Sequence, residues 1–174
     1  MKLRCDLQIN DGKRRLILVP YESELPEHLA LRLAACVLFW NDEPSAELSS
    51  RHPALADQEF RPDCIALDEA GRVKLWVECG RTTPNKLDKL TKRYHDARLV
   101  VLTGSEHDAR RMRETIDAKV SRGAALELWS WKAAEFQEWC QALREDTYVV
   151  GESDGRSLNL VINDVPLAVE LDRF

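Results

Sequence analysis

A chain of 174 residues with 44% hydrophobic side chains has the usual length of one domain and can bury a substantial core. Its longest apolar run, residues 29–40, is too short to span a membrane, and the first residues lack the organisation of a signal peptide, so we expect a cytoplasmic protein with no membrane contact. The formal charge of −5 disfavours a protein that coats nucleic acid, although it leaves room for a local basic surface.

The cysteines are odd in number and scattered along the chain. None lies at the spacing of a zinc site or a C-x-x-C motif, so we expect reduced thiols in a reducing compartment. They are Cys5, Cys36, Cys64, Cys79 and Cys140.

The first elements are a hairpin and a long helix. Residues 2–9 and 14–19 are strand-like and are joined by Asn10-Asp11-Gly12, a hairpin signal. A helix then runs to about Trp40, with Ser23 as a candidate N-cap and Pro26 in its first turn. Residues 41–59 are polar and contain two prolines, which predicts a long loop that is either functional or a plain connection.

The remaining elements alternate between strands and helices before the chain ends in short strands. A capping box opens the helix that follows Ser105. In chain order we expect strands 63–67 and 73–78, helix 85–97, strand 98–103, a helix to about 120, strand 126–131, helix 133–144, and strands 147–150, 157–162 and 166–171.

This alternation predicts an α/β fold with a mixed central sheet flanked by helices. The core should span about residues 23–145. Because both ends are rich in strands, residues 2–19 and 147–172 should form a subsidiary β layer. We expect one domain over residues 1–174.

Two acids stand out in the central hairpin. If residues 68–71 form its loop, Leu67 opposes Arg72 and Asp63 opposes Trp76, which puts Asp63 and Glu78 on the same face. Two carboxylates so close either raise one pKa or recruit a cation, and oxygen ligands favour Mg²⁺ or Mn²⁺. The alternative is a pair of surface acids that contact solvent or make ordinary ion pairs.

Several segments together resemble one family. They are residues 24–33 (ELPEHLALRL), Pro62-Asp63, residues 75–80 (LWVECG) and residues 86–89 (KLDK), in that order. The chain resembles the YaeQ family, small bacterial proteins placed in the PD-(D/E)XK nuclease-like superfamily. The resemblance extends roughly from the first hairpin to Trp131 and implies a restriction-endonuclease-like core.

The resemblance also implies a metal site. By position, Asp63 resembles the first metal-binding carboxylate, and Glu78 resembles the acidic residue of the (D/E)-x-K element. Glu27 resembles the superfamily's helical glutamate. The backbone carbonyl of Cys79 would be a further ligand of Mg²⁺ or Mn²⁺.

The lysine of (D/E)-x-K should stand at position 80, where this chain has Gly80. Some relatives carry that charge on the following helix, and Lys86 or Lys89 could reach back over Glu78. The alternative is that both lysines belong to a solvated basic face. Helix 85–98 is also the most basic part of the chain and a candidate nucleic-acid contact.

Two further residues are candidates for lining the site. Arg32 lies inside an apolar helix, and a buried arginine needs an acidic partner, for which the carboxylate site is the obvious choice. Trp76 shares a strand face with Glu78.

The leading hypothesis is therefore a metal-dependent, nuclease-type phosphodiesterase acting on nucleic acid. The alternative is a nuclease fold without catalysis that acts as a nucleic-acid-binding or protein-binding regulatory module. The retained carboxylates favour the first, and the displaced lysine and the acidic charge favour the second.

Overall fold

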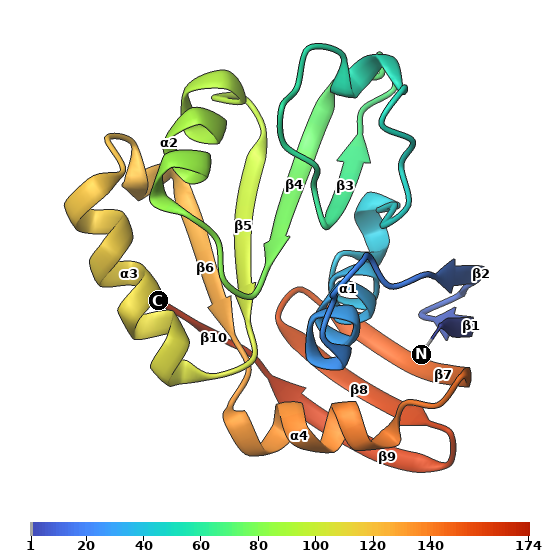
Figure 1. Ribbon diagram of the computed structural model, residues 1–174. Coiled ribbons are helices and arrows are strands. Elements are labelled where there is room, and N and C mark those ends of the chain that lie inside the picture. Colours follow the sequence, from blue (N-terminus) through green and yellow to red (C-terminus); the bar gives the residue numbers. More distant parts are fainter. Residues whose placement is uncertain (1) are drawn as a thin grey trace.

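Residues 2–174, which the computed structural model describes, form four α-helices and two five-stranded sheets (Figure 1). The core sheet contains, in spatial order, β10 (Asp172–Arg173), β6 (Leu126–Ser130), β5 (Arg98–Thr103), β4 (Val73–Cys79) and β3 (Cys64–Leu67). The terminal sheet contains β2 (Gly12–Leu18), β1 (Leu3–Ile9), β7 (Asp146–Asp154), β8 (Ser157–Ile162) and β9 (Val165–Glu170). The helices are α1 (Pro26–Leu38), α2 (Pro84–Arg93), α3 (Glu106–Lys119) and α4 (Ala133–Ala142), with short 3-10 turns at Trp40–Asp42, Pro53–Leu55 and Gly123–Ala125.

The core sheet is mixed. Strands β4, β5 and β6 run parallel, and β3 and β10 pair antiparallel at the two edges. Parallel neighbours need crossover connections, which α2 and α3 supply on one face of the sheet, while α1 covers the other face (Figure 1). The mixed α/β fold predicted from the alternating pattern is confirmed.

Helix α1 is the centre of the larger hydrophobic core. Residues 29–38 are all buried, because one side of the helix faces the core sheet and the other faces the terminal sheet. The helix begins after Leu25 with no side-chain cap, and Ser23 has a φ of 65° in the preceding turn, so the predicted Ser23 N-cap is wrong. The Glu24 carboxylate instead accepts a hydrogen bond from the Tyr21 backbone N–H, which holds that turn outside the helix.

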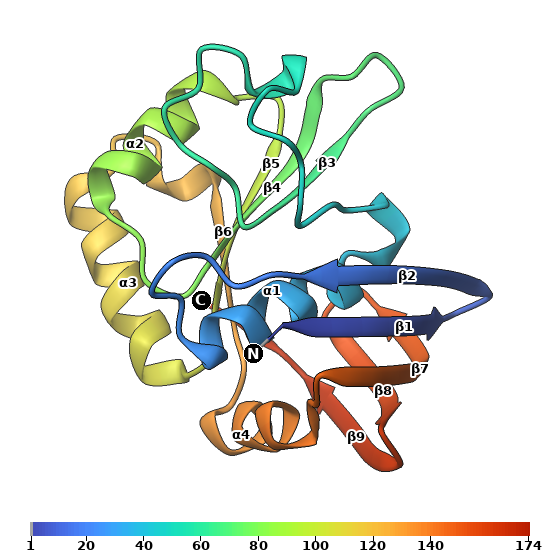
Figure 2. The same cartoon turned by 45° about the vertical axis from the view of Figure 1, so that its right-hand side comes forward.

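The two ends of the chain meet in the terminal sheet. Strand β1 pairs antiparallel with β2 through a two-residue turn and parallel with β7, so the N-terminal hairpin lies beside the C-terminal strands (Figure 2). The final strand β10 returns to the core sheet beside β6, which the sequence pattern did not predict. None of the helices that the structure describes is long and apolar enough to cross a membrane.

The register of the central hairpin differs from the prediction. Ile65 pairs with Trp76 and Cys64 with Val77, two residues away from the expected alignment. One residue of this shift arises because Leu67 pairs with Val73 rather than with Arg72, and the other arises from a bulge between Ala66 and Leu67. A shift by two residues preserves the face of every side chain. Ile65 and Trp76 both belong to the hydrophobic cluster on the α2 side, so the same-face relation expected for Asp63 and Glu78 survives the correction.

Candidate functional site

Four ionisable side chains meet where β3 begins and β4 ends, beside the first turns of α1 and α2. We call Asp63, Glu78, Lys86 and His28 the carboxylate cluster. The side chains of Asp63 and Glu78 are only 12% and 5% exposed, so both acids are recessed. Acids are rarely this buried unless they are paired, and both here have cationic partners.

Glu78 is held by two donors. The indole Nε1–H of Trp76 donates to Oε1 over 2.7 Å, and the Lys86 ammonium donates to Oε2 over 2.6 Å. Lys86 reaches Glu78 because the Thr83 side chain caps α2, which places Lys86 in the first turn next to the end of β4. Burial raises the pKa of Glu78 to about 7; the Lys86 charge opposes this shift and the Asp63 charge adds to it.

Asp63 is held from its own sheet and from α1. Its Oδ2 accepts a hydrogen bond of 2.8 Å from the Cys79 backbone N–H and lies 3.4 Å from His28 Nε2. These contacts fix the orientation of the carboxylate. The Cys79 thiol is buried and its pKa is raised by burial, so this side chain is a poor nucleophile.

His28 joins the cluster to a second acid. Its Nδ1 lies 2.5 Å from Glu24 Oε1. Burial lowers the His28 pKa, but the hydrogen bonds and charges of Asp63 and Glu24 more than offset this and raise it to about 9. At neutral pH the imidazole is therefore a cation whose two N–H groups face two carboxylates. Gly80 has a φ of 71° and lies beside His28, because a Cβ at this position would be 3.7 Å from the imidazole Cδ2.

Arg32 extends this chain of contacts. It is fully buried and donates to Glu24 over 3.0 Å and to Glu47 over 2.8 Å, with its guanidinium 4.2 Å from the centre of the Tyr21 ring. An acidic partner was expected, but the expected partner was the carboxylate site itself. Arg32 instead reaches Asp63 indirectly, through Glu24 and His28.

Two of the site residues expected from the sequence lie outside the cluster. Glu27 is exposed, and its charge acts on Cys140 of α4 rather than on the two carboxylates. Lys89 pairs over 2.6 Å with Glu59, and both side chains are at least half exposed. Of the two candidate lysines, the structure therefore brings Lys86 to Glu78 and leaves Lys89 on the surface.

The long loop after α1 forms one wall of the site. Residues 56–61 lie against α2, where Gln58 donates to the Tyr94 hydroxyl and the Arg93 guanidinium donates to two loop carbonyls. At the end of this segment, the Arg61 carbonyl accepts a hydrogen bond of 3.2 Å from the Lys86 ammonium. The Phe60 ring lies 5.6 Å from the same ammonium.

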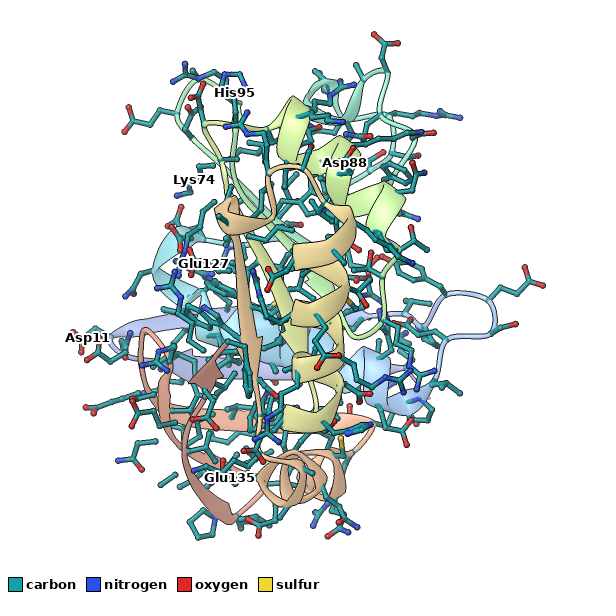
Figure 3. All side chains as sticks on the ribbon, turned by 90° about the vertical axis from the view of Figure 1, so that its left-hand side faces the viewer. Asp11, Lys74, Asp88, His95, Glu127 and Glu135 are labelled. Carbon is teal, nitrogen blue, oxygen red and sulfur yellow. The ribbon has the colours of Figure 1, made fainter. Side chains whose placement is uncertain are left out.

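The other cations of the basic segment 85–98 are engaged within the protein. Lys92 pairs with Asp88, and Arg98 pairs with Glu127; Figure 3 labels both acids. Paired in this way, these cations contribute less positive potential to a nucleic-acid surface than their number predicts.

The donor set of the cluster consists of two carboxylates. Within residues 2–174 no group of three or more His, Cys, Asp or Glu side chains is arranged to hold a metal ion. Mg²⁺ is commonly bound through one or two carboxylates and completed by water and substrate phosphates, so two carboxylates have the chemistry of a hard-cation site but are only part of a ligand set.

Sequence reasoning did not assign His28 or Glu24 to the site. Glu24, His28 and Arg32 recur every four residues in the sequence, which is the spacing of side chains on one face of a helix, although Glu24 itself lies just before α1. That spacing was the available signal. Glu47 carried no signal, because it comes from the long loop.

The fold and site define a mixed α/β protein with two mixed sheets, four helices and a recessed pair of acids. The chain matches the family described as "YaeQ protein" over residues 5–160, and it belongs to that family. The family expected from the sequence motifs is thereby confirmed.

Two crystal structures share the fold. The YaeQ protein from Xanthomonas axonopodis pv. citri has a TM-score of 0.75 at 18% identity, covering 99% of this chain and 96% of that one. The YaeQ protein from Pseudomonas syringae has a TM-score of 0.73 at 14% identity, covering 99% of this chain and 93% of that one. No curated protein matches the chain.

Proposed function

We propose that the carboxylate cluster is a degenerate PD-(D/E)XK site and that the protein is a metal-dependent phosphodiesterase acting on nucleic acid. The observation that carries the proposal is the meeting of Asp63, Glu78 and Lys86. An aspartate, a glutamate and a lysine converge at the end of one hairpin, although the lysine comes from α2 rather than from position 80. These are the residue types of the PD-(D/E)XK pattern, and their convergence supports the proposal of a restriction-endonuclease-like core.

In this proposal Asp63 and Glu78 would hold Mg²⁺ or Mn²⁺, with the Cys79 carbonyl as a further ligand. Such an ion would supply charge neutralisation at a phosphodiester and activation of water. The Cys79 N–H and His28 orient the Asp63 carboxylate, and Trp76 orients Glu78. The Lys86 ammonium, paired with Glu78, supplies the positive charge that the missing lysine at position 80 would bring to the phosphate.

A second candidate function keeps the fold and loses the chemistry. Two observations favour it: Lys86 and His28 already neutralise the two acids, and Glu27 lies outside the cluster. A site compensated in this way needs no metal ion to be stable. Such a protein would be a nucleic-acid-binding or protein-binding regulatory module.

Cleavage assays separate the two functions. Labelled single-stranded and duplex DNA and RNA are incubated with the protein and Mg²⁺ or Mn²⁺, beside Asp63→Asn and the control Glu59→Gln. Cleavage that needs the metal, is lost in Asp63→Asn and is retained in the control supports the enzyme. Absence of cleavage in the wild type on all four substrates supports the module.

A further inference from the structure

We infer that Arg61 is a phosphate-binding residue of this site and that its ligand is the backbone of single-stranded nucleic acid. The inference deepens the proposed function and rests on it for the location of the site. It concerns residues 56–61, the segment before Asp63, in which the sequence identified no site residue.

The first observation is that the Arg61 side chain lies over an aromatic ring. Its guanidinium lies 5.3 Å from the centre of the Tyr21 ring, whose other neighbour is the buried guanidinium of Arg32 at 4.2 Å. Arginine stacks readily on aromatic rings and keeps its N–H groups free to bind an oxyanion. Stacking also restricts the side chain before a ligand arrives, which lowers the entropy lost on binding.

The second observation is the balance of charge around the cluster. Both cations of the carboxylate cluster are neutralised by acids: Lys86 by Glu78, and His28 by Asp63 and Glu24. Arg61 is exposed, and within residues 2–174 its side chain has no hydrogen bond or ion pair with an acid. It is therefore the cation of this site that remains available to an incoming anion.

The third observation is location. Arg61 precedes Asp63 by two residues, and its own carbonyl accepts a hydrogen bond from the Lys86 ammonium. A phosphate bound at Arg61 thus sits beside the recessed carboxylates, where a neighbouring phosphodiester of the same strand can reach them.

The preference for a single strand follows from the small number of available cations. A protein that grips a duplex neutralises many phosphates at once, whereas this chain carries a charge of −5 and pairs most of the cations of its basic helix. A flexible strand needs few contacts and can bend toward acids that are 12% and 5% exposed. The half-buried ring of Phe60, the residue before Arg61 in the chain, lies 5.6 Å from the Lys86 ammonium and adds an aromatic surface for a base.

The test measures binding without metal, so that it is independent of catalysis. A fluorescent single-stranded oligonucleotide of about ten nucleotides is titrated in EDTA over a series of salt concentrations, with fluorescence anisotropy as the readout. Wild type is compared with Arg61→Gln and with Arg110→Gln. Arg110 is a matched control, because it is an exposed arginine whose guanidinium lies 5.9 Å from the centre of the Phe174 ring. It belongs to α3, a helix that contributes no side chain to the cluster.

We expect Arg61→Gln to weaken binding about tenfold, as loss of a hydrogen bond to a charged group does. The slope of log K against log salt should become shallower by about 0.7, the share of one phosphate contact on a single strand. Arg110→Gln should match the wild type. Equal binding by wild type and Arg61→Gln, no binding by the wild type, or tighter binding of a duplex of the same length would each overturn the inference.

Failure here is distinguishable from failure of the proposed function. Metal-dependent cleavage that Asp63→Asn abolishes, together with unchanged oligonucleotide binding in Arg61→Gln, would reject the inference and leave the enzyme standing. Loss of binding in Arg61→Gln without any cleavage would leave the phosphate site and favour the regulatory module.

Discussion

Replacing Glu78 by glutamine should change how the stability of the protein depends on pH. Burial raises the pKa of Glu78 in the folded protein to about 7 from an ordinary value of 4.5. Between these two pH values the folded chain holds a proton that the unfolded chain has released. Stability must therefore fall as pH rises through this window, because the carboxylate has to ionise in a buried position.

The size of the effect follows from the pKa. At 1.36 kcal/mol per pKa unit, the folded state loses on the order of 3 kcal/mol between pH 4.5 and 7, and the loss is complete above the folded pKa. Glutamine has nearly the same shape, can keep a hydrogen bond from the Trp76 indole, and does not titrate. The difference in unfolding free energy between wild type and Glu78→Gln should therefore shift by about 3 kcal/mol across this window.

Urea unfolding at half-unit pH steps from 4.5 to 8 measures this difference directly. Glu69→Gln is the control, because Glu69 is exposed in the hairpin loop and the substitution removes the same charge. The control should run parallel to the wild type. A Glu78→Gln curve that also runs parallel to the wild type would refute the buried, pKa-shifted carboxylate.

Two further predictions concern the cations of the cluster. Lys86→Met should destabilise the protein at pH 8 by about 3 kcal/mol or more, because it leaves Glu78 buried without a cationic partner. The loss should be smaller at pH 5, where Glu78 is protonated. Lys89→Met breaks an exposed ion pair and should lower the unfolding free energy by less than about 1 kcal/mol in the same urea assay. The His28 ring should titrate near pH 9 by NMR, and its stabilising effect should be complete below pH 6.5 and lost as pH rises through 9. Asp63→Asn should lower the His28 pKa, and an unchanged titration in the variant would contradict the contact between His28 and Asp63.

Part of the site followed from local patterns in the sequence. Strand alternation placed Asp63 and Glu78 on one face, and this survived an error of two residues in register, since side-chain direction repeats every second residue. Helix spacing identified Lys86 and Lys89 as candidates to reach Glu78 without choosing between them, and the Thr83 cap of α2 places Lys86 in the first turn, next to the end of β4. These inferences needed only the geometry of neighbouring elements.

The remainder depended on tertiary structure. The phase of α1 against the sheets decides whether Glu27 or His28 faces Asp63, and that phase is set by packing against two sheets at once. The bulge at Ala66 has no clear sequence signal, so the register could not be derived. The acid that completes the pairing of Arg32, Glu47, comes from a loop whose path local propensities do not determine.

The most direct test of the central claim, that Asp63 and Glu78 form a metal site, is calorimetric titration of Mn²⁺ into the wild type and Asp63→Asn. We expect saturable binding by the wild type that the substitution removes, with weaker binding at pH 5.5 than at pH 8 because Glu78 becomes protonated near pH 7. No binding by the wild type, or equal binding by both proteins, would contradict it.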